Sequence, residues 1–194
     1  VTDNLGALRL GYVRDTLDDA NFPGTGSRGE LLLTSQLDAL GASTEGQTAD
    51  LTWDKALSRG PNRFLFGTRL HASWGELNVF DSLAPLGGFT NLSGYHEREL
   101  LGSNAALFRG VYYRRLGDSG QLFSVPAFVG GSLEAGNVYA DRDQLISLEN
   151  LIYAGSIFVG LDSPFGPIFL GYGYADTGES SLYLNFGTLL RPRF

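Results

Sequence analysis

Few side chains in the sequence could support catalysis or bind a metal ion. There is no cysteine, which excludes a thiolate nucleophile and a thiolate metal site. The two histidines, His71 and His96, have no second ligand at a metal-binding spacing. No Gly-x-Ser-x-Gly segment, the elbow that presents the serine of many hydrolases, occurs in the chain. The sequence therefore predicts no catalytic residue, no metal site and no cofactor, and it does not indicate an enzyme.

Two short motifs between residues 15 and 29 resemble ligand-binding signals but favour a turn. The segment Gly24-Thr-Gly-Ser-Arg-Gly29 has the spacing of the dinucleotide fingerprint, which needs a buried strand before it and a helix after it. Here an aspartate-rich segment precedes it and an alternating, strand-like segment follows it. Asp15, Asp18 and Asp19 could hold a calcium ion, but their spacing lacks the EF-hand register. We interpret both motifs as parts of one acidic, solvated turn.

The overall composition narrows the class of protein. The chain has 194 residues and a net charge of −7, with 18% charged residues, 12% aromatic residues and 27 glycines. An acidic chain without a basic patch argues against nucleic acid as a partner. No run of 18 apolar residues is present, so the sequence predicts no transmembrane helix. Because the sequence begins at Val1 without a signal peptide or an initiator methionine, we expect a processed product or an excised piece.

Apolar and polar residues alternate with a period of two along most of the chain, which predicts about nine strands and no convincing helix. The predicted strands span residues 5–14, 30–40, 48–57, 63–74, 105–116, 122–135, 151–162, 168–174 and 181–190. Most are near ten residues long, the length that a tilted strand needs to cross a bilayer, whereas strands of soluble proteins are usually shorter. The pattern favours an antiparallel transmembrane β-barrel over a soluble β-sandwich.

The two faces of the predicted strands differ in character. One face carries leucine, valine and aromatic residues, as in Leu51 and Trp53 or in Leu107, Val111 and Tyr113, and would contact lipid. The other face carries aspartate, arginine, glutamate and glycine, and would line a hydrated or hydrogen-bonded lumen.

One long loop, residues 75–103, interrupts the strand pattern. Its centre, Leu86-Gly-Gly-Phe-Thr-Asn-Leu-Ser-Gly-Tyr95, has neither a helical nor a strand period, yet its aromatic and leucine side chains favour burial over disorder. The other connections broadly alternate between short and long, as in barrels with short periplasmic turns and long extracellular loops. This alternation predicts that the loop is extracellular, and its burial-prone side chains predict that it packs inward. An odd strand count with Val1 outside predicts that at least one upstream strand is missing.

Several segments together resemble the BamA/TamA-type surface-antigen barrels of the outer membrane. They are the loop centre 86–95, Glu99-Leu-x-Gly102, Val111-Tyr-Tyr-Arg-Arg-Leu116, the turn 15–29, Ser132-Leu-Glu-Ala-Gly-Asn137, Gly166-Pro-Ile-Phe-Leu-Gly-Tyr-Gly173 and the terminal Phe194. The Leu-Ser-Gly-Tyr and Ser-Leu-Glu-Ala-Gly-Asn forms are most similar to barrels that follow a patatin-like phospholipase domain, in the type V secretion group. The resemblance covers nearly the whole chain. It implies that residues 1–194 form the C-terminal part of a sixteen-stranded barrel in a bacterial outer membrane.

The resemblance also implies a site in the lumen. In such barrels the extracellular loop folds back inside, and an arginine at its tip pairs with an acidic residue on a later strand. The matching tip residues here are Gly87, Gly88, Asn91, Leu92, Ser93, Gly94 and Tyr95, and Glu134 matches the acidic position. Ser93 stands where the arginine would be, and a Ser–Glu hydrogen bond is weaker than an Arg–carboxylate pair. Arg98 is an alternative partner, and a solvated lumen carboxylate is the alternative interpretation of Glu134.

Three functions remain open at this stage. The first is a barrel that anchors an upstream patatin-like phospholipase domain, with translocation of that domain as a further role. Phe194 would then be the C-terminal signal read by the barrel assembly machinery. The second is a protein-transport or insertase pore of the same superfamily. The third is a soluble β-sandwich binding module. The expected partners are outer-membrane lipids including lipopolysaccharide, the assembly machinery, the upstream domain and a second copy in a homodimer.

Overall fold

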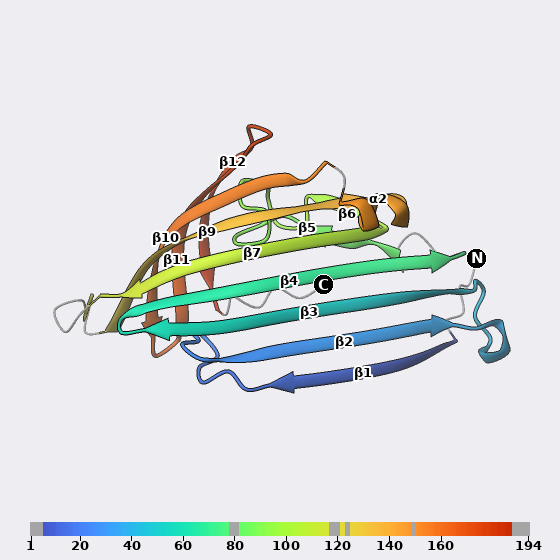
Figure 1. Ribbon diagram of the computed structural model, residues 1–194, viewed down its shortest axis with the longest axis horizontal. Coiled ribbons are helices and arrows are strands. Elements are labelled where there is room, and N and C mark those ends of the chain that lie inside the picture. The colour runs from blue at the N-terminus through green and yellow to red at the C-terminus, as the bar shows by residue number, and fades with distance from the viewer. Residues whose placement is uncertain (1–5, 78–81, 117–120, 123–124, 149, 188–194) are drawn as a thin grey trace.

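The computed structural model describes residues 6–77, 82–116, 121–122, 125–148 and 150–187 and shows an all-β chain (Figure 1). Most strands belong to one long, curved antiparallel sheet, which confirms the predicted fold class. The remaining strands, β5 (Ala84–Leu86) and β6 (Leu100–Gly102), form a separate two-stranded sheet within the long loop. None of the helices in the described part of the chain is long and apolar enough to cross a bilayer.

The main sheet is a meander in which strands that are neighbours in sequence are neighbours in space. Its order in the described residues is β1 (Ala7–Asp15), β2 (Gly26–Gln36), β3 (Gly46–Arg59), β4 (Asn62–Gly75), β7 (Asn104–Arg115), β9 (Val125–Tyr139), β10 (Ile152–Ser163), β11 (Gly166–Ala175) and β12 (Ser180–Phe186). A short strand, β8 (Gln121–Leu122), also pairs with β9. Within the described residues β1 pairs only with β2 and β12 only with β11, so the sheet has two open edges.

The strand ends differ from the prediction in one informative place. The predicted strand 30–40 corresponds to β2, Gly26–Gln36. Pairing with β3 already begins at Gly26, and residues 37–40 lie beyond the paired strand. Asp38–Leu40 instead form a 3-10 helix, η1, which Gly41 ends with a φ of 86°. A six-residue helix, α2 (Arg142–Ser147), lies in the connection between β9 and β10 and was not predicted, because one and a half turns are too short to show a helical period.

The two faces of the sheet mostly match the predicted alternation. On β3, Leu51 and Trp53 are exposed on the convex outer face, whereas Asp54 is buried on the inner face. The prediction was wrong for β7, where Val111 and Tyr113 are fully buried on the inner face while Tyr112 is exposed on the outer face. Both faces of β7 carry large apolar residues, so alternation alone could not assign them.

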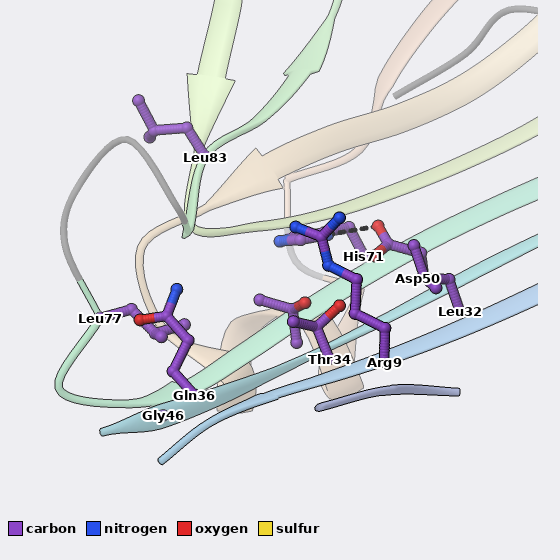
Figure 2. Close-up of a pocket in the computed structure, with 10 residues that line it drawn as sticks. Arg9, Leu32, Thr34, Gln36, Gly46, Asp50, His71, Leu77 and Leu83 are labelled. Carbon is purple, nitrogen blue, oxygen red and sulfur yellow. Dashed lines mark hydrogen bonds and ion pairs between the residues drawn. The ribbon is translucent and has the colours of Figure 1, made fainter. Parts of the chain in front are cut away.

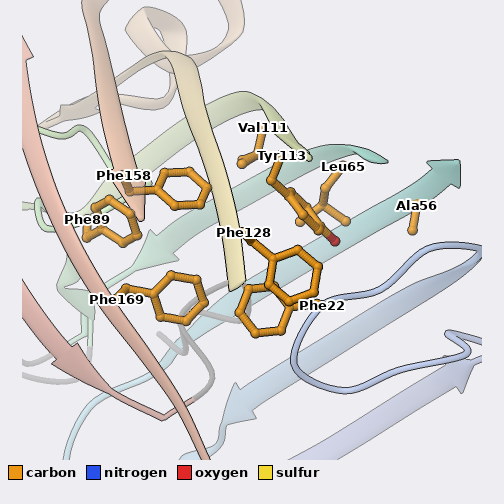
Figure 3. Packing of buried hydrophobic residues seen from close by; sticks show 9 residues of the cluster. All are labelled: Phe22, Ala56, Leu65, Phe89, Val111, Tyr113, Phe128, Phe158 and Phe169. Carbon is orange, nitrogen blue, oxygen red and sulfur yellow. The ribbon is translucent and has the colours of Figure 1, made fainter. Parts of the chain in front are cut away.

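The inner face is not uniformly polar. A cluster of buried apolar residues fills the end of the curved sheet that carries the β1–β2 turn (Figure 3). It consists of Phe22, Ala56, Leu65, Phe89, Val111, Tyr113, Phe128, Phe158 and Phe169. Phe22 comes from the turn and Phe89 from the long loop, so two connections supply core residues to the inside of the sheet.

Candidate functional site

The centre of the long loop, residues 86–95, is the most deeply buried connection in the described chain, and we call it the loop tip. Every residue from Ala84 to Tyr95 is buried, whereas His96 to Glu99 are exposed. The loop tip packs against the inner face of the sheet, with Leu86, Leu92 and Tyr95 in a second apolar cluster. The long loop therefore folds into the curved sheet.

The backbone of the loop tip is tightly folded and partly strained. Thr90 and Leu92 have φ values of 56° and 69°, a left-handed conformation that costs energy for residues with a side chain. Gly87, with a φ of 112°, sits where an added Cβ would lie 2.3 Å from the carbonyl oxygen of His96. The side chain of Asn91 donates a hydrogen bond to the Gly87 carbonyl (2.8 Å) and closes the tip on itself. The surroundings must supply the energy that holds this conformation.

Glu134 on β9 is one of the groups that hold the tip. Its carboxylate accepts hydrogen bonds from the backbone N–H of Ser93 (2.7 Å) and from the Ser93 hydroxyl (2.7 Å). The Ser132 hydroxyl donates to the same carboxylate and lies 2.6 Å from the Ser156 hydroxyl. Glu134 is only 3% exposed, so these bonds replace water around its charge.

Two buried arginines of the sheet hold the other side of the tip. Arg69 on β4 donates from Nη1 to the Asn91 side-chain oxygen at 2.5 Å. Arg109 on β7 pairs with Asp54 at 2.8 Å and reaches the Thr90 carbonyl at 3.4 Å. The cationic groups thus lie on the sheet and the loop supplies acceptors, an arrangement that the sequence resemblance did not suggest.

Small residues on β11 make room for the loop tip. A Cβ added to Gly171 would lie 2.6 Å from the ring of Phe89, and one added to Gly173 would lie 2.6 Å from the Cβ of Ser93. Beside them Tyr183 on β12 accepts from the Gly94 N–H (2.9 Å). The glycines and the tyrosine complete a recess whose shape fits this tip.

The structure brings most of the predicted site residues together. Gly87, Gly88, Asn91, Leu92, Ser93, Gly94 and Tyr95 form one buried unit, and Ser93 and Glu134 are in direct contact. Arg98 is exposed while Glu134 is buried against serines, so Arg98 does not take the role of the tip arginine. Phe194 lies outside the described residues.

Sequence reasoning missed Arg69, Arg109 and Tyr183 as contacts of the tip, and Asp54 as the partner of Arg109. For Arg69 and Tyr183 the available signal was their position on the face opposite the predicted lipid face. Arg109 gave no such signal, because it shares the face of Leu107 and Val111, which was predicted to contact lipid. Which of several polar-face residues reach a loop depends on the curvature of the sheet, and the pattern does not contain that information.

A second group of polar residues lines a cavity of about 220 Å³ beside the loop (Figure 2). The imidazole of His71 on β4 lies 2.6 Å from the Asp50 carboxylate and 3.1 Å from the Ser82 carbonyl. Arg9 and Thr34 face the same cavity from β1 and β2. His71 therefore connects the start of the loop to β3, on the inner face of the sheet.

The acidic turn binds its own backbone. One carboxylate oxygen of Asp18 accepts from the N–H groups of Gly24 (2.8 Å) and Thr25 (2.9 Å). Burial would raise the pKa of Asp18, but these backbone hydrogen bonds and the nearby Arg63 charge outweigh burial and lower it below its ordinary value. Asp19 likewise accepts from the N–H of Phe22. The segment 24–29 leads into β2 rather than a helix, as the turn interpretation requires.

Metal-binding geometry is not present in the part of the chain that the structure describes. No group of three or more His, Asp or Glu side chains there could hold an ion. His96 is exposed and contacts Glu99, three residues later.

Comparison with known proteins places the fold. No protein-family model matches the chain, and no curated protein matches it in sequence. Among solved structures the chain is similar to BamA from Haemophilus ducreyi lacking POTRA domains 1–3, with a TM-score of 0.76 and 13% sequence identity. The chain has the fold of part of a BamA barrel. The match covers 92% of this chain and 41% of the BamA chain, so this chain spans less than half the length of that protein.

Proposed function

We propose that this chain is part of an outer-membrane β-barrel whose lumen is closed by its own extracellular loop, and that the barrel anchors an upstream domain. The observation that carries the proposal is the contrast between the two faces of one sheet. The outer face exposes a belt of apolar side chains such as Leu33, Phe66, Leu133 and Ile157, which suits contact with lipid. The inner face holds charged residues in direct contact with the inward-folded loop tip.

The strand count supports a larger barrel. Each neighbouring pair on the sheet path is antiparallel and the described path holds nine strands, so β1 and β12 run in the same direction. Closing these strands on themselves would need a parallel pair and would leave a lumen that side chains fill, with little room for a loop. An odd number of further strands would allow antiparallel closure throughout. Seven more strands would give the sixteen that the sequence resemblance implies.

The anchoring role rests on how firmly the lumen is filled. The loop tip contacts Arg69, Arg109, Glu134, Phe158 and Tyr183, which come from five different strands. A barrel filled in this way is suited to holding an attached domain at the membrane. The patatin-like nature of that domain, its translocation and the type V secretion route rest on the sequence resemblance. So do contacts with the assembly machinery, lipopolysaccharide or a second copy.

A transport or insertase pore is the second candidate, and one observation favours it. The cavity beside His71 lies along the inner faces of β1 to β4 and is lined by Arg9, Thr34 and Asp50. A polar cavity next to a docked loop could widen into an aqueous path.

The deciding experiment measures ion conductance in planar bilayers. The protein that is tested includes the further strands that complete the sheet. The anchoring proposal predicts a sealed bilayer with the native loop and conductance after Glu134→Ala, which removes the acceptor of Ser93. Steady conductance of the native protein would favour the pore. Failure of the protein to insert into lipid under any condition would contradict both functions.

A further inference from the structure

The turn between β1 and β2, residues 16–25, folds into the sheet as the loop tip does, but from the opposite end. Phe22 is 1% exposed and Pro23 is fully buried, although both belong to a connection. Asp18 and Asp19 bind the backbone N–H groups of the turn and fix its shape. We call this segment the inward turn. Its burial needs an explanation, because a simple hairpin connection would lie in solvent.

The inward turn crosses the inside of the sheet. It starts from β1 and β2, at one edge of the sheet path, and its residues bind strands further along. Arg63 on β4 donates to the Phe22 carbonyl, and the Tyr113 hydroxyl on β7 donates to the Pro23 carbonyl. Asn21 donates to Asp162 on β10 at 3.4 Å. These contacts tie the first hairpin to the middle and far strands.

The ring of Phe22 is inserted into the cluster of buried apolar residues described above, which we call the aromatic cluster (Figure 3). It stacks on Phe128 with ring centres 3.9 Å apart and an interplanar angle of 11°. Phe169 lies 5.2 Å from Phe22 on one side and 6.1 Å from Phe89 of the loop tip on the other. Gly160 provides space, because a Cβ there would lie 3.1 Å from the Phe22 ring.

We propose that the inward turn is a second plug, and that it is coupled to the loop tip through the aromatic cluster. The two segments enter from opposite ends of the sheet and pack against the same ring, Phe169. Withdrawal of either segment removes side chains that pack around the other segment. A close-packed interior does not tolerate a cavity of phenylalanine size, so the remaining segment is destabilised. The lumen therefore opens when both segments leave, and release of either one promotes release of the other. The inference rests on the proposal that the inner face is a barrel lumen.

The absence of cysteine from the sequence makes a direct test possible. Thr90→Cys places a single thiol in the loop tip at a position that is 0% exposed, and Ala56→Cys places one in the aromatic cluster. The rate of labelling by a water-soluble maleimide, in detergent micelles, reports how often each position opens. Labelling in micelles does not depend on insertion into lipid, so failure of the proposed membrane function would not affect the result.

Coupling predicts a reciprocal effect. Phe22→Ala should increase labelling of Thr90→Cys at least tenfold, and Phe89→Ala should increase labelling of Ala56→Cys to a similar degree. Phe165→Ala is the matched control, because Phe165 belongs to another turn and is 99% exposed. It should change neither rate.

Two results would overturn the proposal. The first is that Phe22→Ala leaves labelling of Thr90→Cys within twofold of its parent while Phe89→Ala increases it, because the turn would then be independent of the loop. The second is that Leu31→Arg, an outer-face change remote from the cluster, increases labelling as much as Phe22→Ala. In that case labelling would report general destabilisation. If Phe22→Ala does not fold, Phe22→Leu replaces it, with the same direction expected and a smaller increase.

Discussion

Removing the Glu134 carboxylate should release the loop tip without unfolding the sheet. In Glu134→Ala the tip loses two hydrogen bonds to a charged acceptor, one from the Ser93 N–H and one from the Ser93 hydroxyl. The Ser93 hydroxyl still accepts from the Thr90 N–H, and Ser132 keeps Ser156 as a partner. The backbone N–H and the hydroxyl O–H of Ser93 are therefore the two donors that lose their acceptor.

The expected size of the effect follows from these contacts. A hydrogen bond to a charged group contributes about 1.5–3 kcal/mol, and water entering the space left by the side chain recovers part of that. We expect docking of the tip to weaken by about 2–4 kcal/mol, which corresponds to about a 30- to 1000-fold larger population of the open loop. Glu134→Gln, which keeps one acceptor oxygen, should have an intermediate effect.

Maleimide labelling of Thr90→Cys measures this population directly. Glu134→Ala should increase the labelling rate by at least thirtyfold at unchanged sheet content by circular dichroism. Glu97→Ala removes an exposed carboxylate from the same loop and should leave the rate unchanged. A labelling rate for Glu134→Ala within twofold of the parent would refute the argument that Glu134 holds the tip.

Three further changes test other parts of the structure. Gly173→Ala should displace the loop tip and increase its labelling, because the added Cβ would lie 2.6 Å from the Cβ of the tip serine, whereas Gly11→Ala, whose Cβ would meet nothing closer than 3.8 Å, should not. Leu31→Arg on the outer face should lower the free energy of unfolding from lipid by about 2–4 kcal/mol, whereas Leu32→Arg on the inner face should lower it by less than about 1 kcal/mol. Equal decreases would mean that the two faces do not differ in this way. Asp18→Asn should lower stability at neutral pH. The difference from the parent should shrink as the pH falls below about 4 and vanish only below the lowered pKa of folded Asp18, because the stability that a lowered pKa gives is lost as the carboxylate becomes protonated in the folded state. A difference for Asp18→Asn that stays constant from pH 7 to pH 2 would show that its charge is not involved.

The strand pattern could be predicted from the sequence because it is local. Residues such as Leu51 and Trp53 alternate with polar neighbours, and any antiparallel sheet with one apolar face requires that alternation. The assignment of faces failed on β7, where Val111 and Tyr113 face inward against other buried side chains and both faces carry large apolar residues. Periodicity identifies a strand but assigns its faces only when they differ.

The candidate site was predictable in part. Ser93 and Glu134 could be paired only through the resemblance to a family, since 41 residues separate them in sequence. Arg69 and Arg109 could not be assigned to the loop tip, because their reach depends on sheet curvature. The burial of Phe22 was also missed, because an aspartate-rich turn is usually solvated and the aromatic cluster that receives this ring is assembled from distant strands.

The central claim, that this sheet belongs to a membrane barrel with a filled lumen, is tested most directly by its need for an amphiphile. The chain would be refolded in detergent or lipid and in plain buffer, and unboiled and boiled samples would be compared by electrophoresis together with circular dichroism. We predict β structure only with detergent or lipid, with a boiling-dependent shift in mobility once the strands that complete the barrel are present. A folded, monodisperse β protein in plain buffer would contradict the account, because the apolar outer face would then have no lipid to contact.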